Sequence, residues 1–364
     1  MGKAIRHLST KKIVGCMIGA LMVVSLIGID GTLVPAAAFK YGKSFQAADI
    51  QCGDTIGAGE RVKLTQDIGP CSGGPAITVV GPAVLDLNGH TVAGDGDIDG
   101  IVIEGEKARV MNGTVIGCYN AVVVMGQGRH QIKRINAEDN IDQAFVVYSD
   151  NNQFLWNKAD MNGDDGFYVE GNGNRFILNK IYDNDDEGLE IEGNDNRVVA
   201  NRARGNSSDS YEIGGDTNRL VFNKAISGGR EGFEIEGIGN VVKHNRATDN
   251  GGTGFRLEGS QTHLQSNRAI DNADCGILVD DDAFDNTIKK NRVKGSGESG
   301  IQVEKDAYGN VITRNSVKGN GLNNELAKSV EDAEFFDMQD EDNGAEANTW
   351  DRNRFETSNQ DYIN

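Results

Sequence analysis

The feature that most constrains this chain is a series of asparagines at a fixed spacing. They recur every 22 residues and then every 24: Asn157, Asn179, Asn201, Asn223, Asn245, Asn267, Asn291 and Asn315. A second series precedes most of them by five residues: Asn152, Asn174, Asn196, Asn218, Asn240, Asn286 and Asn310. A repeat of this length indicates a solenoid, in which each unit contacts mainly its neighbours.

Each unit contains three short apolar alternations separated by turn residues, for example Phe176 with Leu178, then Ile181, then Leu189 with Ile191. Alternation at period two indicates a strand with one buried face, and these runs are too short for helices. Three strands and three corners per unit make one turn of a right-handed parallel β-helix. We therefore expect an all-β solenoid of about eleven coils, roughly 50 Å long at one strand spacing per coil.

Two residue types are expected to shape the corners. Asparagine tolerates the left-handed backbone of a sharp turn, and its amide can bond to the same amide one coil away. Glycines that open the third strand would supply the other special turn: Gly166, Gly188, Gly232, Gly254, Gly276 and Gly300. The repeated asparagines and glycines are therefore interpreted as structural.

The chain divides into four predicted segments. Residues 1–38 have a basic start, an apolar run over Ile13–Ile29 and a small-residue end at Ala36–Ala38, which is typical of a secretory signal. An uncleaved anchor is the alternative. An N-terminal cap over 39–75, a β-helix over 76–320 and a C-terminal cap over 321–364 follow. Export would place the protein outside the cell or in the periplasm, where Cys52 and Cys71 are expected to form a disulfide.

Several segments resemble a known family: LDLNGHTV at 85–92, GIVIEG at 100–105, VMNGTV at 110–115 and NTWDRNRF at 348–355. With the asparagine series, they are similar to bacterial right-handed β-helix proteins of the pectin-lyase-like fold. That group includes NosD-like proteins and the carbohydrate-binding and sugar-hydrolase repeats. The resemblance covers about residues 50–358 and implies the fold. It does not name a reaction, because this fold carries lyases, epimerases, hydrolases and non-catalytic binders.

The outward positions of the third strand form two columns rich in carboxylates. One contains Tyr168, Glu190, Glu212, Glu234 and Arg256, and the other contains Glu192 and Glu236. Carboxylates one strand apart repel by about 1 kcal/mol in water. Calcium takes several carboxylate oxygens and would offset this repulsion. We therefore expect Ca²⁺ to be held by acidic residues of the preceding turn: Asp164, Asp165, Asp186, Glu187 and Asp209.

An enzyme built on this face would act on an acidic polysaccharide as a lyase or C5-epimerase. Calcium would acidify the proton next to a uronate carboxylate, and a nearby base would remove it. Arg256 is the first candidate base and Tyr168 the second, and Glu212 and Glu234 are further catalytic candidates. The expected sugar-binding residues are Glu190, Glu192, Glu236, Arg230, Lys180 and Arg202. A glycoside hydrolase that uses two carboxyls is the less favoured variant.

Lys180 and Arg202 belong to a basic series that follows the asparagines: Lys158, Lys180, Arg202, Lys224, Arg246, Arg268 and Arg292. This series is either a track for an anionic polysaccharide or a solvated face balanced by nearby acids. The formal net charge of −19 disfavours nucleic acid and anionic membranes as partners. We expect a monomer without stable membrane insertion after signal cleavage.

A non-catalytic role stands beside the enzyme hypothesis. Active clefts are commonly walled by long loops, and the connections between these repeats stay short. The chain would then be a glycan-binding solenoid, or an interaction module of the cell surface or periplasm. The two hypotheses are separated by whether any polysaccharide is converted to product.

Overall fold

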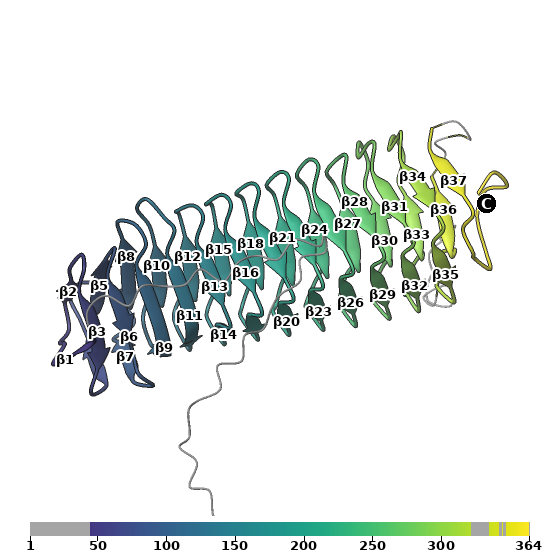
Figure 1. The fold of residues 1–364 in the computed structure, drawn as a ribbon. Helices are drawn as coiled ribbons and strands as arrows, with labels where there is room; N and C mark the ends of the chain where they lie inside the picture. Colours follow the sequence, from purple (N-terminus) through teal and green to yellow (C-terminus); the bar gives the residue numbers. More distant parts are fainter. Residues whose placement is uncertain (1–43, 322–334, 342–343, 345–346, 364) are drawn as a thin grey trace, which may run out of the picture. The chain divides into compact units, whose positions relative to one another are not determined.

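The computed structural model describes residues 44–321, 335–341, 344 and 347–363, and the predicted signal segment lies outside them. Phe45 to Asn364 form one compact unit. The described residues form strands and no helix, so they contain no helix that could span a membrane. The strands pair in parallel and belong to one sheet of 24 strands and one of 13. Figure 1 shows the coils following one another in chain order.

The 13-stranded sheet contains the third strand of each coil and is called the third-strand sheet here. Its members are β2 (Asp54–Ile56), β5 (Ile77–Val80), β8 (Ile101–Glu104), β10 (Val122–Val124), β12 (Phe145–Val147), β15 (Phe167–Val169), β18 (Leu189–Ile191), β21 (Tyr211–Ile213), β24 (Phe233–Ile235), β27 (Phe255–Leu257), β30 (Ile277–Val279), β33 (Ile301–Val303) and β36 (Met338–Asp340).

The 24-stranded sheet consists of two stacks that meet at the asparagine corner. The first stack contains β1 (Gln46–Ala48), β3 (Arg61–Leu64), β6 (Val84–Asp86), β9 (Arg109–Ile116), β11 (Gln131–Glu138), β13 (Gln153–Leu155), β16 (Arg175–Ile177), β19 (Arg197–Val199), β22 (Arg219–Val221), β25 (Val241–Lys243), β28 (His263–Gln265), β31 (Thr287–Lys289), β34 (Val311–Thr313) and β37 (Thr349–Asp351).

The second stack shares β9 and β11, which are long enough to run through both stacks. Its other members are β4 (Ile68–Cys71), β7 (Thr91–Gly94), β14 (Lys158–Asp160), β17 (Lys180–Tyr182), β20 (Arg202–Arg204), β23 (Lys224–Ile226), β26 (Arg246–Thr248), β29 (Arg268–Ile270), β32 (Arg292–Lys294) and β35 (Ser316–Lys318). The predicted all-β parallel solenoid is confirmed, with slightly more coils than the expected eleven because pairing already starts at β1.

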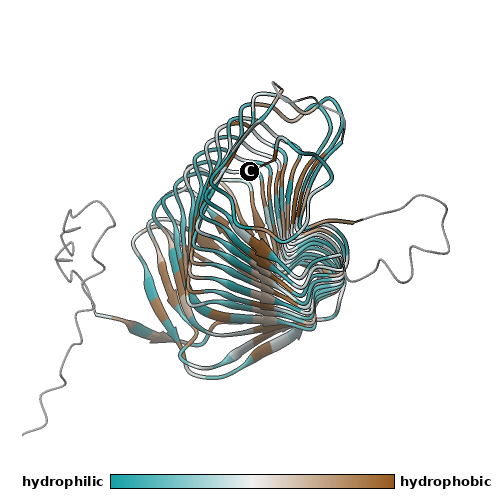
Figure 2. Ribbon diagram, turned by 90° about the vertical axis from the view of Figure 1, so that its right-hand side faces the viewer, coloured by the Kyte–Doolittle hydropathy of each residue, from teal (hydrophilic) through white to brown (hydrophobic). Residues whose placement is uncertain are grey.

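The core consists of inward side chains that stack from coil to coil. On the ribbon in Figure 2, brown marks hydrophobic residues that recur at matching positions of successive strands. Phe167, Tyr211, Phe233 and Phe255 are fully buried, and the rings of Tyr211 and Phe233 stack with centroids 4.7 Å apart. Leu178 is different: it was expected on the inward face, but it lies at the corner and is 41% exposed. The strand that contains Phe176 ends at Ile177, so the following residue makes the turn instead of packing inside.

The asparagine ladder bonds each coil to the next, as the sequence indicated. Asn179 Oδ1 accepts the backbone N–H of Asn157 at 2.9 Å, and Asn179 Nδ2 donates to the carbonyl of Phe154 at 3.0 Å. Left-handed geometry, however, belongs to the residue before each asparagine: φ is 56° at Trp156 and 59° at Leu178. The asparagines therefore satisfy buried backbone groups instead of making the turn themselves.

The glycines that open the third strand were also misinterpreted as turn formers. They do not have positive φ, and they are needed because the coils approach closely at this point. A Cβ atom on Gly166 would lie 2.6 Å from the carbonyl oxygen of Gly188 and 2.3 Å from a methyl carbon of Ile181. Any side chain would push two coils apart.

The two ends of the described chain continue the solenoid. Strands β1 to β4 lie in the stretch 39–75 that was assigned to a cap, and β2 and β4 already pair with β5 and β7 of the next coil. Cys52 and Cys71 form the predicted disulfide there. At the other end, Asn348 Oδ1 accepts the backbone N–H of Asn310 at 3.0 Å, so the ladder extends into the predicted C-terminal cap.

Candidate functional site

An open groove of about 620 Å³ crosses the outer face of the third-strand sheet between β10 and β21. Val146 and Tyr168 line the groove and belong to an apolar cluster separate from the core, in which Met125 and Tyr168 pack against Val102, Val123 and Val146. Two further tyrosines line the groove, Tyr119 and Tyr148, and both are about half exposed. The remaining lining is polar: Asn120, Asp142, Gln143, Asp164, Asp165, Asp186, Glu187, Glu190 and Glu212.

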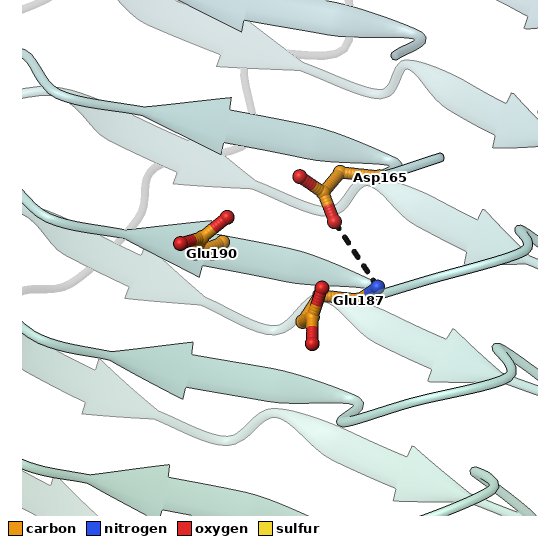
Figure 3. Close-up of side chains that lie close together, drawn as sticks. All are labelled: Asp165, Glu187 and Glu190. Atoms are coloured by element: carbon orange, nitrogen blue, oxygen red, sulfur yellow. Dashed lines mark hydrogen bonds between the residues drawn. The ribbon is translucent and has the colours of Figure 1, made fainter. Parts of the chain in front are cut away.

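The acidic wall of the groove continues along the sheet as a carboxylate ladder. It combines a turn column, Asp165, Glu187, Asp209 and Glu231, with a strand column, Glu190, Glu212 and Glu234. The members fall into overlapping triads in which one ligand atom of each residue lies within 4.8 Å of the others. Figure 3 shows the first triad, Asp165 with Glu187 and Glu190, where Asp165 Oδ1 accepts the backbone N–H of Glu187 at 3.0 Å.

This crowding of carboxylates changes their protonation. Burial, together with the charge of Asp164, raises the pKa of Asp165 to about 10. Burial, together with the nearby carboxyls of Glu231 and Glu234, raises the pKa of Asp209 to about 10. Burial and the charge of Glu187 raise the pKa of Glu212 to about 8. Neutral forms are therefore favoured at the buried positions in the absence of a cation.

The triad of Asp209, Glu231 and Glu234 is the most enclosed part of the ladder. Asp209 is fully buried, and its Oδ1 accepts the backbone N–H of Glu231 at 2.6 Å. Asp209 Oδ2 and Glu231 Oε2 are buried without a hydrogen bond. Arg230 lies 3.7 Å and 3.5 Å from them, and its side chain is 55% exposed. Two buried carboxylate oxygens that make no hydrogen bond, with only the half-exposed Arg230 near them, fit a site for a hard cation.

Arg256 lies outside the groove in a network of its own. Its guanidinium contacts Glu234 at 3.0 Å, Glu258 at 2.9 Å and Asp280 at 2.6 Å. Burial opposes its charge, but the hydrogen bond and charge of Asp280, with the two glutamates, raise the pKa of Arg256 above its ordinary value. A guanidinium held in this way is poorly suited to accept a proton.

The structure brings together many of the residues selected from the sequence. Tyr168, Glu190 and Glu212 are direct neighbours in one column, and the groove also contains Asp164, Asp165, Asp186 and Glu187. Glu192 and Glu236 lie directly after the ends of β18 and β24, two residues beyond Glu190 and Glu234. Lys180 and Arg202 lie on the other sheet, away from the groove.

Sequence reasoning missed the groove residues of the earlier coils, above all Tyr119, Tyr148 and Asp142. They precede the regular asparagine series, so no repeat register assigned them to the outer face. A usable signal did exist: in the strands Val122–Val124 and Phe145–Val147 even the outward position is apolar. An outward valine under a neighbouring tyrosine indicates a covered patch.

Two family models match the chain. A model described as "Right handed beta helix region" matches residues 188–359, and one described as "Periplasmic copper-binding protein (NosD)" matches residues 88–263. Among curated proteins, none matches the sequence significantly.

The donors present do not fit copper. Within the described residues, each group of acidic, histidine or cysteine side chains that could hold a metal consists of carboxylates alone. Copper sites use imidazole and sulfur ligands, whereas carboxylate oxygens suit calcium, magnesium or manganese. In the described part of the chain, the cysteines outside the disulfide are Cys118 and Cys275, and both are buried. Burial raises the pKa of the Cys118 thiol to about 12, which disfavours the thiolate that would bind a metal.

Solved structures show the same architecture at low sequence identity. The periplasmic alginate epimerase AlgG aligns with a TM-score of 0.57 and 15% identity over 81% of this chain and 77% of its own. The A-module of the Azotobacter vinelandii mannuronan C-5 epimerase AlgE6 aligns with a TM-score of 0.56 and 15% identity, over 84% of this chain and 91% of the module. The A-module of AlgE4 from the same organism aligns with a TM-score of 0.52 and 16% identity, over 74% of this chain and 88% of the module. The chain is therefore a right-handed parallel β-helix protein with the pectin-lyase-like fold.

Proposed function

We propose that this is an exported carbohydrate-active protein whose groove binds an acidic polysaccharide with the help of a divalent cation. The groove carries this proposal, because it combines three tyrosines and Val146 with a wall of carboxylates. Sugar rings have apolar faces that pack on aromatic side chains, and hydroxyl groups that bond to carboxylates. The alginate epimerases with the same fold support a uronate polymer as the ligand.

A uronate and a carboxylate wall repel each other, so a bridging cation is part of the proposal. Asp209, Glu231 and Glu234 would hold it at the end of the groove, since they contribute the two buried oxygens without hydrogen bonds. Asp209 also forms a triad with the groove residues Glu187 and Glu212. Asp165 and Glu187 form the neighbouring triad, and Asp164 and Asp186 border it in the groove. Calcium is the proposed ion, and when bound it would neutralise the uronate carboxylate and favour loss of the adjacent proton.

The proposed reaction is elimination or C5 epimerisation of the uronate, since both begin with removal of that proton. Tyr168 and Glu212 are the proposed proton-transfer groups, because they flank Glu190 in one column and line the groove. Tyr168 packs against the apolar cluster and donates a hydrogen bond to Glu170 at 3.1 Å. Arg256, the first choice from the sequence, is instead proposed to keep the end of the carboxylate ladder neutralised.

A non-catalytic glycan binder is the second candidate, and one observation favours it. Hydrogen bonds from the backbone N–H of one coil to the asparagine Oδ1 of the next keep a constant offset of 22 residues from Asn152 to Asn267, so long loops do not wall the groove there. An open groove of this kind can hold a long polymer without enclosing a reacting bond.

The test is a polysaccharide panel with calcium or with EDTA, containing polymannuronate, polyguluronate, polygalacturonate and a neutral glucan. Ultraviolet absorbance reports elimination, and proton NMR reports inversion at C5. Tyr168→Phe and Glu212→Gln should abolish product, whereas Tyr182→Phe, on the other sheet, should not. Binding without product on any glycan would favour the non-catalytic candidate. Absence of both binding and product would refute the role of the groove.

A further inference from the structure

A second charged surface lies on the 24-stranded sheet, at the asparagine corner. It contains the basic series already noted, Lys158, Lys180, Arg202, Lys224, Arg246, Arg268 and Arg292, which we call the basic column. Each member is the direct Cα partner of the next in a parallel pair of strands. All are exposed except Lys158, which is half-buried. The column therefore repeats one cation at every strand spacing, about 4.8 Å.

The protein does little to balance these charges. Among the described residues, the basic column forms one ion pair, between Lys158 and Asp160. Across the corner, Arg175, Arg197 and Arg219 form a second in-register row of cations. Like charges directly opposite each other on a sheet are destabilising. The interpretation from sequence that nearby acids balance this face is therefore not supported by the contacts.

An apolar seam runs between the two rows of cations, at the left-handed corner positions. Trp156, Leu178 and Phe222 are 47%, 41% and 50% exposed, and the ring of Phe222 stacks on His244 at 5.1 Å. Trp156 has Lys133 over its ring at 4.9 Å. A face that served only solubility would have polar side chains here. Exposed rings between cations are instead typical of a surface that stacks a ligand.

We propose that this corner is a second glycan-binding surface, which takes a linear polyanionic polysaccharide lying across successive coils. Such a polymer repeats an anionic group and a flat apolar ring face in alternation. The rows of cations would pair with the anionic groups, and the apolar seam would pack against the ring faces. The charge is complementary although the chain as a whole is acidic, because the acids of the groove lie on the other sheet. This inference does not depend on the groove or on calcium.

The test compares two charge-matched triple variants of the full chain. The first is Arg202→Gln, Lys224→Gln and Arg246→Gln, three successive members of the basic column. The control is Lys107→Gln, Arg129→Gln and Lys305→Gln, three exposed cations away from the column. Binding to polymannuronate, heparin and a neutral glucan is measured in EDTA over a range of salt concentrations. EDTA keeps calcium-dependent binding in the groove out of the measurement.

The wild type and the control should bind both polyanions and not the neutral glucan. The column variant should bind them at least tenfold more weakly, with a shallower dependence on salt by up to about 2 in the log–log slope. Equal affinity of the two variants would overturn the proposal. The proposal would also be overturned if duplex DNA or anionic phospholipid vesicles bound as tightly as the polysaccharides and lost as much affinity in the column variant. Tyr168→Phe should leave this binding unchanged, which separates it from the proposed groove function.

Discussion

Replacing Asp209 with asparagine should stabilise the metal-free protein and remove its response to calcium. The pKa of Asp209 is raised to about 10, against about 3.9 in an unfolded chain. At pH 7 the folded state therefore retains a proton that the unfolded state has released. Three pKa units at about 1.36 kcal/mol each set an upper limit near 4 kcal/mol for this cost. Asparagine removes the cost and keeps the acceptor for the backbone N–H of Glu231.

The sign of the pH dependence follows from the same shift. A carboxyl whose folded pKa is raised destabilises the protein progressively as pH rises above the unfolded pKa of about 4, up to the folded pKa of about 10. The stability gap between Asp209→Asn and wild type should therefore widen from pH 5 to pH 9, by at most about 1.4 kcal/mol per pH unit. Relaxation around the site and the half-exposed Arg230 would make the observed slope smaller.

The assay is urea or thermal unfolding at several pH values, in EDTA and in millimolar calcium. Asp216→Asn is the matched control, since Asp216 also accepts the backbone N–H of the residue 22 positions later, at 2.7 Å, but is exposed. Wild type should gain stability from calcium, most at high pH, and Asp209→Asn should not. A variant that is less stable than wild type in EDTA at pH 8 would refute the reasoning and show that Arg230 holds Asp209 ionised.

Three further outcomes follow from the contacts. Asn201→Ala should lower the unfolding free energy by about 2–4 kcal/mol, because buried backbone groups of neighbouring coils lose their hydrogen-bond partners. The same change at the exposed Asn194 should cost much less, and thermal unfolding of the two variants tests this difference. Arg256→Gln should destabilise the protein by about 3 kcal/mol at pH 8 and by less at pH 5, where the freed carboxylates can protonate, as unfolding at the two pH values would show. Reducing the Cys52–Cys71 disulfide should remove about 2–4 kcal/mol and expose the first coils to limited proteolysis, while leaving the later coils resistant.

Periodicity carried the fold prediction, because in-register stacking places the same residue type at the same position of every coil. The sequence therefore identified the inward column of Phe167 and Tyr211 and the acidic outer column of Glu190 and Glu212. The groove itself was not predicted, since about half of its residues lie in coils where the asparagine series has not begun and the apolar outward valines there were not considered. Tyr148 looks like an isolated aromatic in the chain until β12 and β15 place it beside Tyr168.

Local backbone geometry was the other source of error. Asparagine is a common left-handed residue, so a corner asparagine was assigned that conformation. In the structure the residue before it takes positive φ even when it is Trp156 or Phe222, because the asparagine side chain has to remain aligned with the ladder. The ladder bonds are buried and repeated, and together they outweigh a cost of order 1–3 kcal/mol for each strained corner.

Parallel stacking also explains why this molecule has two oppositely charged surfaces. Each side chain of one coil is repeated one strand spacing away in the next, so a charged position becomes a column of like charge. Such a column is unfavourable in isolation. In the carboxylate ladder, burial and shared protons reduce the cost, as the raised pKa values of Asp165 and Asp209 show. The basic column cannot be neutralised in that way, because lysine and arginine keep their charge at neutral pH. The two surfaces should therefore respond to different agents: pH and divalent cations for the ladder, ionic strength and polyanions for the column.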